Sequence, residues 1–272
     1  MLVERPSWAP EDVDLDRPSI ARVYDYYLGG THNFAADRAF AQAVLESMPD
    51  LRAAVHGNRA FLRRAVRYLS GQGVRQFIDL GSGIPTAGNV HEIVQVTAPG
   101  SRVVYVDNDP VAVAHSRAIL DGVPNAAVVA ADLRRPAEVL ASPALRAVVD
   151  FREPVAVMMV AVLHFVTPEE HPEDVVAGYA AAAVPGSYIA ISHAGPASGR
   201  PLTDEERGAY EAYRRSPTPV VLRDSRDVEE LLGDLTIVEP GVVPAPLWRP
   251  DGPTDDLPGA SMLVSAGIGR KD

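Results

Sequence analysis

Two closely spaced glycines follow a short apolar run in the stretch FIDLGSGIPTAG, residues 77–88. Glycine lets the backbone turn tightly and approach a ligand, and a helix that begins after the turn points its N-terminus at that ligand. Gly81 and Gly83 fit the first two positions of a dinucleotide-binding loop, but the third position is Thr86, preceded by Pro85. No phosphate-binding lysine follows. The loop therefore suits a ligand without a pyrophosphate, although a simple strand-to-helix turn would give the same pattern.

Acidic residues close the next two apolar runs, VVYVDNDP (103–110) and VVAADL (128–133). A carboxylate at such a strand end can accept hydrogen bonds from both ribose hydroxyls, which suits Asp107, and Asn108 would then lie beside an adenine. Asp132 could accept from the adenine amine while the Leu133 amide donates to a ring nitrogen. Each acid alone could instead cap a helix. Together with the glycines, they predict an adenosine pocket.

Alternating strands and helices must position these residues. Strands are expected at 75–80, 102–107, 126–132, 154–163, 187–193, 235–239 and 261–268, and helices at 86–97, 110–120, 172–184, 203–215 and 225–233. This alternation predicts an α/β fold with a doubly wound, mostly parallel sheet. Ligands of such folds bind beyond the carboxyl ends of the strands. The ends that matter most are 79–83, 107–109, 132–133 and 161–164.

The first 74 residues are expected to be mainly helical. Ser19 could cap a first helix that Gly29 and Gly30 end, a second helix spans 35–47, and a third keeps a 3.6-residue period from Leu51 to Leu69. We therefore divide the chain into an N-terminal arm and helical cap, residues 1–74, and a sheet domain, residues 75–272.

The overall composition limits the possible partners. The net charge is −11 and no basic run stands out, which disfavours nucleic acid or an anionic membrane as the main partner. The absence of cysteine excludes disulfides, thiolate zinc sites and cysteine nucleophiles. The N-terminus has no apolar signal core, and the longest apolar run, 155–163, is about half of a membrane helix. We expect a cytoplasmic protein; the oligomeric state stays open.

The order and spacing of the motifs resemble those of class I S-adenosylmethionine-dependent methyltransferases. FIDLGSGIPT resembles their first motif, VVYVDNDP the second, VVAADL the third and PVAVMMVAVLHFV the fourth, over about residues 75–195. RPSIARVYDYYLGGTHNFAADRAF (17–40) resembles a narrower actinobacterial S-adenosyl methyltransferase family that shares a YDYxLGGxxNFAADR opening, and this resemblance covers nearly the whole chain. Pro85 departs from the class, in which another glycine is common.

The resemblance implies a Rossmann-like sheet, usually of seven strands with the last antiparallel, and S-adenosylmethionine as the methyl donor. It does not name the acceptor, which we expect to be a small molecule. The implied cofactor residues are Asp79, Gly81, Ser82 and Gly83 at the methionine end, Asp107 at the ribose, Asn108 and Asp132 at the adenine, and Ala161 and Val162 beside the sulfonium.

The segment YDYYLGGTHNF, residues 24–34, could close the cofactor pocket by folding over the open end of the sheet. In that interpretation Gly29 and Gly30 allow close approach, and Arg59 pairs with the methionine carboxylate, which guanidinium matches bidentately. The other candidates in this region are Tyr27, His32 and Asn33. Alternatively, the aromatic residues are core contacts of the cap and Arg59 is a solvated helix residue.

Methyl transfer from a sulfonium mainly requires alignment and exclusion of water, but an oxygen or nitrogen acceptor can also need a base. His164, just after the fourth strand, and His193, at the end of the fifth, are the best-placed candidates, although His164 could instead pack under the site and His193 could be a loop residue. No metal site is expected, since the His164, Glu169, Glu170 and His171 spacing matches no standard ligand motif.

Three functions are compatible with these motifs. The leading one is a methyltransferase with S-adenosylmethionine as cofactor, and the second is a regulatory or interaction module that binds S-adenosylmethionine without turnover. The third is an NAD-dependent oxidoreductase. Thr86 argues against the oxidoreductase, as does the lack of a Tyr-x-x-x-Lys pair, because the only lysine is Lys271.

Overall fold

The computed structural model describes residues 6, 9–11, 13–85, 88–196, 200–216, 218–254 and 262–272. Within these ranges a central sheet has eight strands in the order β3-β2-β1-β4-β5-β8-β6, and the short β7 pairs with β8. The strands β1 to β5 run parallel, and β8 is antiparallel to β5. Their bounds are β1 Gln76–Leu80, β2 Arg102–Asp107, β3 Ala126–Ala130, β4 Ala156–Val160, β5 Tyr188–Ala194, β6 Thr236–Ile237, β7 Val243–Pro244 and β8 Val264–Arg270.

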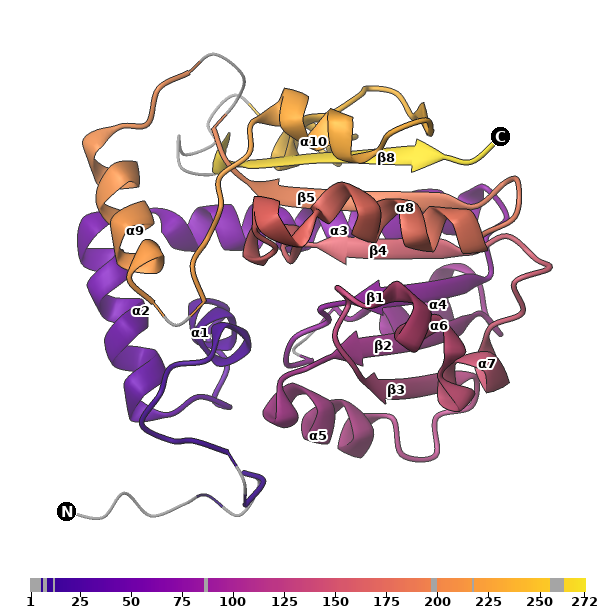
Figure 1. Cartoon of the computed structure of the whole chain (residues 1–272), viewed down its shortest axis with the longest axis horizontal. Helices are drawn as coiled ribbons and strands as arrows, with labels where there is room; N and C mark the ends of the chain where they lie inside the picture. The colour runs from indigo at the N-terminus through magenta and orange to yellow at the C-terminus, as the bar shows by residue number, and fades with distance from the viewer. Residues whose placement is uncertain are drawn as a thin grey trace.

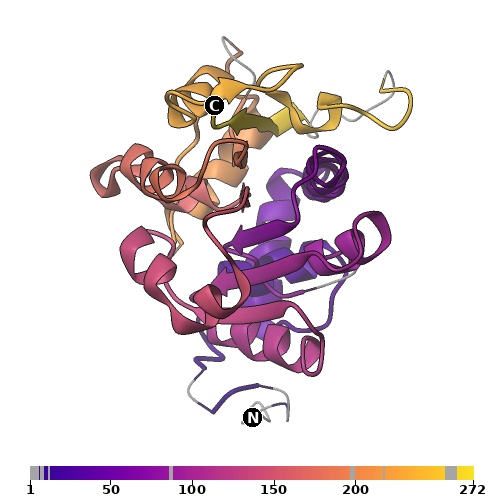
Figure 2. The same cartoon turned by 90° about the vertical axis from the view of Figure 1, so that its right-hand side faces the viewer.

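Helices cover both faces of this sheet, because its central strands β1, β4 and β5 are almost wholly buried. On one face Phe61 and Leu62 pack with Val90 and Val94 against β1, β2 and β4. On the other face Val139, Leu145 and Tyr179 join the buried side chains of the same strands. The two layers are visible on either side of the sheet in Figure 2. The helices are α3 Leu51–Gly71 and α4 Val90–Thr97, then α5 Pro110–Ile119, α6 Pro136–Ala141, α7 Pro143–Val148, α8 Pro172–Ala182 and α10 Ser225–Leu231.

Three further helices gather beyond the arrowheads of the parallel strands (Figure 1). These are α1 Ile20–Tyr27, α2 Ala35–Ser47 and α9 Asp204–Arg214, and single 3₁₀ turns occur at Leu163–Phe165, Pro168–Glu170 and Ala245–Leu247. Val44 and Met48 pack against Ala209, so α2 and α9 are joined by an apolar contact. The carboxyl end of the sheet is therefore roofed by segments from both halves of the chain.

A buried arginine ties the N-terminal arm to this roof. The Arg22 guanidinium donates to Asp37 at 2.8 Å and to the carbonyl oxygens of Asp14 and Arg17. Ser19 precedes α1, but its hydroxyl donates to the Asp109 carboxylate instead of capping the helix, which corrects the expected role of this serine.

The predicted doubly wound, mostly parallel sheet is confirmed, with an antiparallel β8 and one strand more than the seven expected. The helix expected from residue 86 begins at Val90, where Glu92 accepts hydrogen bonds from the Gly88 and Asn89 amides; Thr86 lies outside the described residues. The helices α6 and α7 were not predicted, because each is a single six-residue segment. Among the described residues, no helix is both long and apolar enough to cross a membrane.

Candidate functional site

One cavity of about 740 Å³ lies between the carboxyl ends of the strands and the helical roof. This volume is in the range of small-molecule and cofactor pockets. The cavity brings together residues from the ends of β1, β2, β3 and β4 with residues of α1, α3 and α9. The predicted site residues in its lining are Tyr27, Arg59, Asp79, Gly81, Ser82, Gly83, Asp107, Asn108, Asp132, Leu133, Ala161, Val162 and His164.

The glycine loop after β1 is held close to the neighbouring strand ends. The Gly81 amide donates to the Val106 carbonyl at 2.8 Å. Gly81 has a φ of 65°, and a Cβ atom there would lie 2.2 Å from the Val162 side chain, so only glycine fits. Gly83 also has a positive φ, but the space beside it is open. The buried Ser82 hydroxyl has no hydrogen-bond partner among the residues that the structure describes, which marks it as a group that a ligand could engage.

Asp107 links the glycine loop to α5. Its carboxylate accepts from the Gly83 amide at 2.7 Å and from the Asp109 amide at 2.8 Å. Burial raises the pKa of Asp107 to about 6, although both amide bonds oppose that shift. The capping role that the sequence left open belongs to Asp109, whose side chain accepts from Val111 and Ala112. Asp107 is thus held by the loop with lone pairs left for a ligand.

Asp79 is a buried carboxylate, 6% exposed, at the end of β1. Burial raises its pKa to about 7, the Arg59 charge acts in the opposite direction, and the Asp107 charge adds to the increase. Arg59 donates to the Gly88 carbonyl at 3.0 Å and so approaches the loop from α3. A buried carboxylate of this kind gains most from a cationic ligand.

Asp132 is engaged in the free protein. Arg134 donates to both of its carboxylate oxygens and also to Glu170, and these bonds lower the pKa of Asp132. The Leu133 carbonyl accepts from the Tyr179 hydroxyl at 2.9 Å, which fixes the backbone beside the cavity. Asn108, by contrast, is exposed in the cavity lining.

A hydrogen-bonded chain connects the end of β4 to the roof. Ala161, which has a φ of 56°, donates its amide to the Ser192 hydroxyl at 2.9 Å. That hydroxyl donates to Asn58 at 2.5 Å, and the Asn58 amide donates to the Tyr24 hydroxyl at 2.9 Å. A left-handed conformation at a non-glycine residue is held only where its surroundings fix it. Asn58 and Ser192 supply that constraint, and neither was among the site residues predicted from the sequence.

The two predicted catalytic histidines have different surroundings. His164 lines the cavity, and its Nδ1 accepts from the Ala194 amide at 3.4 Å, which assigns the hydrogen of the neutral ring to Nε2. Burial, with the nearby His193 and Arg223, holds the pKa of His164 well below its usual range. His193 is fully buried outside the cavity lining. Its Nε2 accepts from Arg223 at 3.0 Å and its Nδ1 bonds the Ala194 carbonyl.

The remaining predicted residues, Gly29, Gly30, His32 and Asn33, are not in the cavity lining. The Asn33 amide donates to Asp25 and to the Gly30 carbonyl, and the His32 amide also donates to Asp25. A Cβ atom at Gly30 would lie 2.0 Å from the Asp25 carboxylate. These residues of the YDYYLGGTHNF segment therefore bond to one another and shape the turn after α1.

The contribution of α9 to the cavity was missed. Ala209, Tyr210 and Tyr213 line it. Their spacing on an otherwise strongly charged helix was the available signal, since an apolar stripe on such a helix marks the buried face. The sequence could not show which buried surface that stripe covers.

The chain was compared with known proteins. The profile of a family described as S-adenosyl methyltransferase matches residues 6–272. A crystal structure of a putative methyltransferase from Thermobifida fusca is 41% identical, with 98% of this chain and 100% of that chain covered and a TM-score of 0.92. A DUF574 family protein from Streptomyces avermitilis is 37% identical, with 95% and 99% covered and a TM-score of 0.90.

More distant structures share the fold alone. An O-methyltransferase family protein from Burkholderia thailandensis is 14% identical, with 94% of this chain and 65% of that chain covered and a TM-score of 0.55. No match was found among curated proteins. None of these findings supports a module without turnover. The chain belongs to the S-adenosyl methyltransferase family, and it is a methyltransferase whose cofactor is S-adenosylmethionine.

Proposed function

We propose that this enzyme transfers the methyl group of S-adenosylmethionine to a small organic acceptor that binds in the same cavity. The observation that carries the proposal is that one cavity is bordered both by the strand-end carboxylates and by the aromatic roof of α1 and α9. A cavity with two chemically different walls suits two different ligands. Its volume, about 740 Å³, lies well within the range found for cofactor and drug-sized ligand sites.

The methionine end of the cofactor would lie against the glycine loop. Asp79 suits the α-ammonium group, because a buried carboxylate is stabilised by a cation, and the unpartnered Ser82 hydroxyl suits a neighbouring polar atom. Arg59 would pair with the α-carboxylate. The cofactor supplies a methyl group on a positively charged sulfur, and Ala161 and Val162 would wall that region.

The adenosine end would lie over β2 and β3. Asp107 accepts two backbone amides and keeps lone pairs for the ribose hydroxyls. Asn108 and the Leu133 amide would contact the adenine. Asp132 takes part only after its bonds with Arg134 rearrange, so we assign it a smaller share of the binding energy.

The protein's own contribution to transfer is alignment and exclusion of water. Tyr24, Tyr27 and Tyr213 cover the roof side of the cavity, and His164 lies beside the end of β4. We leave His193 out of the proposed site because both of its ring nitrogens are engaged by Arg223 and Ala194. Of the five site residues predicted in the N-terminal segment, Gly29, Gly30, His32 and Asn33 are left out and Tyr27 stays in the proposal.

Two measurements test the proposal. Calorimetry should give binding of S-adenosylmethionine and none of NAD; the reverse would refute the cofactor site. Formation of S-adenosylhomocysteine over a panel of small phenols, amines and carboxylic acids should then be detected with at least one acceptor. A blank across the panel with intact cofactor binding would count against a small-molecule acceptor.

A further inference from the structure

The roof side of the cavity is aromatic and nearly uncharged. Tyrosine rings from α1 and α9 face it together with Leu51 and Val55 of α3. Tyr213 packs edge-on against Phe40 with 5.2 Å between ring centroids, and its hydroxyl lies 3.2 Å from that of Tyr27. Such walls fit a flat apolar ligand, because aromatic rings bind other rings by stacking and edge contacts.

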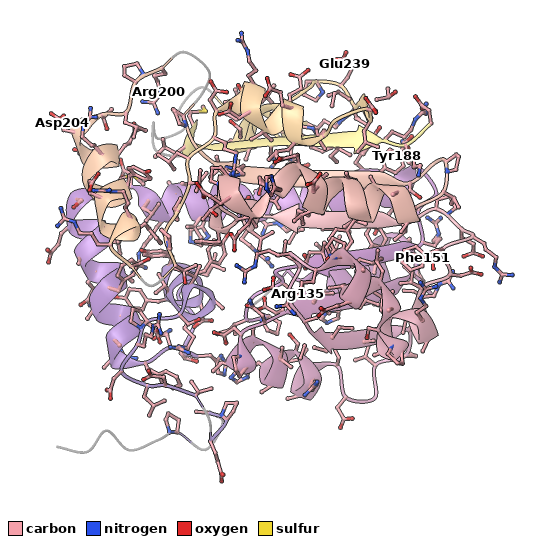
Figure 3. The ribbon with its side chains drawn as sticks, viewed as in Figure 1. Arg135, Phe151, Tyr188, Arg200, Asp204 and Glu239 are labelled. Atoms are coloured by element: carbon pink, nitrogen blue, oxygen red, sulfur yellow. The ribbon has the colours of Figure 1, made fainter. Side chains whose placement is uncertain are left out.

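The charges on this side are neutralised. Among the described lining residues of α1, α3 and α9, the charged side chains are Arg59, whose charge acts on Asp79, and Glu206. Arg200 donates to both of its carboxylate oxygens, at 2.9 and 3.0 Å, and the Thr203 amide donates at 2.8 Å. Figure 3 shows Arg200 near the chain entering α9 at Asp204. A cationic acceptor would therefore lose its hydration without finding a free carboxylate on this side.

The polar groups on the same side are hydrogen-bond donors. Because Asn58 donates to the Tyr24 hydroxyl, the hydrogen of that hydroxyl is left for a ligand. Because the Ala194 amide donates to His164 Nδ1, His164 presents an Nε2–H. Hydrogen bonds connect both donors to β5. Tyr24 is connected through Asn58 to Ser192, and His164 accepts directly from Ala194, two residues further along the strand.

None of these roof-side groups is suited to remove a proton. Burial holds His164 unprotonated with a pKa well below its usual range, and it raises the pKa of Tyr24. Burial alone would raise the pKa of Glu206, but the bonds from Arg200 and Thr203 lower it. Asp79 titrates nearer neutrality, but its carboxylate is assigned to the cofactor's ammonium group.

We propose that the acceptor is an uncharged aromatic compound with a phenolic or enolic hydroxyl, which reacts as its oxyanion held by the Tyr24 hydroxyl and the His164 Nε2–H. This inference rests on the proposed function. The acceptor's hydroxyl proton passes to water. The oxygen then uses a lone pair to bond the methyl carbon while the carbon–sulfur bond breaks and the sulfur keeps its electron pair. His164 and Tyr24 are thus donors to the reacting oxygen, and neither is a base.

Binding of three matched probes tests this assignment. Calorimetry at pH 8, with the enzyme saturated with S-adenosylhomocysteine, compares 4-nitrophenol, which is ionised, with 4-nitroanisole and the cationic 4-nitrobenzylamine. We expect 4-nitrophenol to bind at least about tenfold more tightly than the anisole, as a hydrogen bond to a charged oxygen requires. The cationic probe should bind most weakly. Equal affinity for the phenol and the anisole, or stronger binding of the amine, would overturn the inference.

Two tyrosine variants locate the donor. Tyr24→Phe should weaken 4-nitrophenol binding about tenfold or more and leave 4-nitroanisole unchanged. Tyr26→Phe is the matched control, since Tyr26 is on the same helix but its hydroxyl accepts from Gln42 and is not in the cavity lining. A Tyr24→Phe enzyme that loses S-adenosylhomocysteine affinity instead would place Tyr24 at the cofactor and refute its assigned role.

The wild-type enzyme gives a test that needs no variant. The visible absorbance of bound 4-nitrophenol should titrate at a lower pH than that of the free compound, because donors stabilise the anion; an unchanged or higher pKa contradicts the inference. His164→Gln, which keeps an N–H donor, should preserve that shift, and His164→Leu should reduce it. Failure to bind S-adenosylhomocysteine at all would refute the proposed function itself, whereas cofactor binding without selectivity for the phenol would refute only the acceptor class.

Discussion

Replacing Asp79 by asparagine should stabilise the free enzyme at high pH while it weakens cofactor binding. The carboxylate is buried, and burial raises its pKa to about 7 from an ordinary 3.8. An acid whose folded pKa is raised contributes most to stability below its unfolded pKa. That contribution falls as the pH rises through the folded pKa. The wild type therefore loses stability at this position between about pH 4 and pH 7.

The size of the effect follows from the shift. About three pKa units at 1.36 kcal/mol each correspond to about 4 kcal/mol in total, of which about 2–3 kcal/mol falls between pH 5 and pH 8. Asparagine has no charge to bury, so Asp79→Asn should not show this loss. The difference in unfolding free energy, variant minus wild type, should thus grow by about 2–3 kcal/mol over that interval.

Urea denaturation at pH 5, 6, 7 and 8 measures this difference directly. Asp150→Asn is the control, because Arg152 lowers the pKa of Asp150 and this carboxylate is ionised in the folded and the unfolded protein throughout that pH range. The stability difference for that variant should therefore not change with pH. A stability difference for Asp79→Asn that does not change with pH would refute the reasoning about burial at this site.

Cofactor binding supplies the second half of the same prediction. If the ammonium group binds Asp79, it favours the ionised carboxylate, so wild-type affinity for S-adenosylmethionine should rise from pH 5 to about 7 and then level off. Calorimetry in buffers of different ionisation enthalpy should detect proton release near pH 6. Asp79→Asn should show weaker binding and less proton release; wild-type affinity in this variant would remove Asp79 from the site.

Three other substitutions follow from the same contacts. Asp107→Ala should weaken S-adenosylmethionine binding by roughly 1.5–3 kcal/mol, because it removes a charged hydrogen-bond acceptor. Unchanged affinity in calorimetry would show that Asp107 does not bind the cofactor. Gly81→Ala should lower the unfolding free energy by roughly 1–3 kcal/mol, because the added Cβ would lie 2.2 Å from a valine side chain. Gly83→Ala is the control and should lower the unfolding free energy less, because the space beside Gly83 is open. Equal losses in the two variants would contradict the expected clash at Gly81. Asn58→Leu removes the acceptor of the Ser192 hydroxyl and should lower the unfolding free energy, measured by urea denaturation, by roughly 1–3 kcal/mol. An unchanged unfolding free energy would contradict a stabilising role for this hydrogen-bonded chain.

The sheet could be predicted because its signals are local. The central strands β1 and β2 are rich in apolar residues and almost wholly buried, as expected for strands covered on both faces. The glycine loop, Asp79 and Asp107 could be placed near one another because parallel strands end at the same edge. Their roles in cofactor binding stay predictions.

The roof could not be predicted in the same way, because its contacts join distant parts of the chain. The bond from Ser192 to Asn58 spans 134 residues, and the one between Tyr213 and Tyr27 spans 186. The motif YDYYLGGTHNF indicated a lid, but its most polar residues bond to Asp25 within the segment. A polar residue that stabilises its own turn and one that binds a ligand look alike in a sequence.

The part of the cavity wall formed by α9 and by Met48, the residue after α2, has a consequence for how acceptor preference can change. Met48 and Ala209 meet there, on segments that contain none of the strand-end carboxylates. Substitutions at this contact can change the shape of the space proposed for the acceptor without changing the strand-end residues proposed to bind the cofactor. Related enzymes can in this way differ in the acceptor that they methylate and still use the same methyl donor.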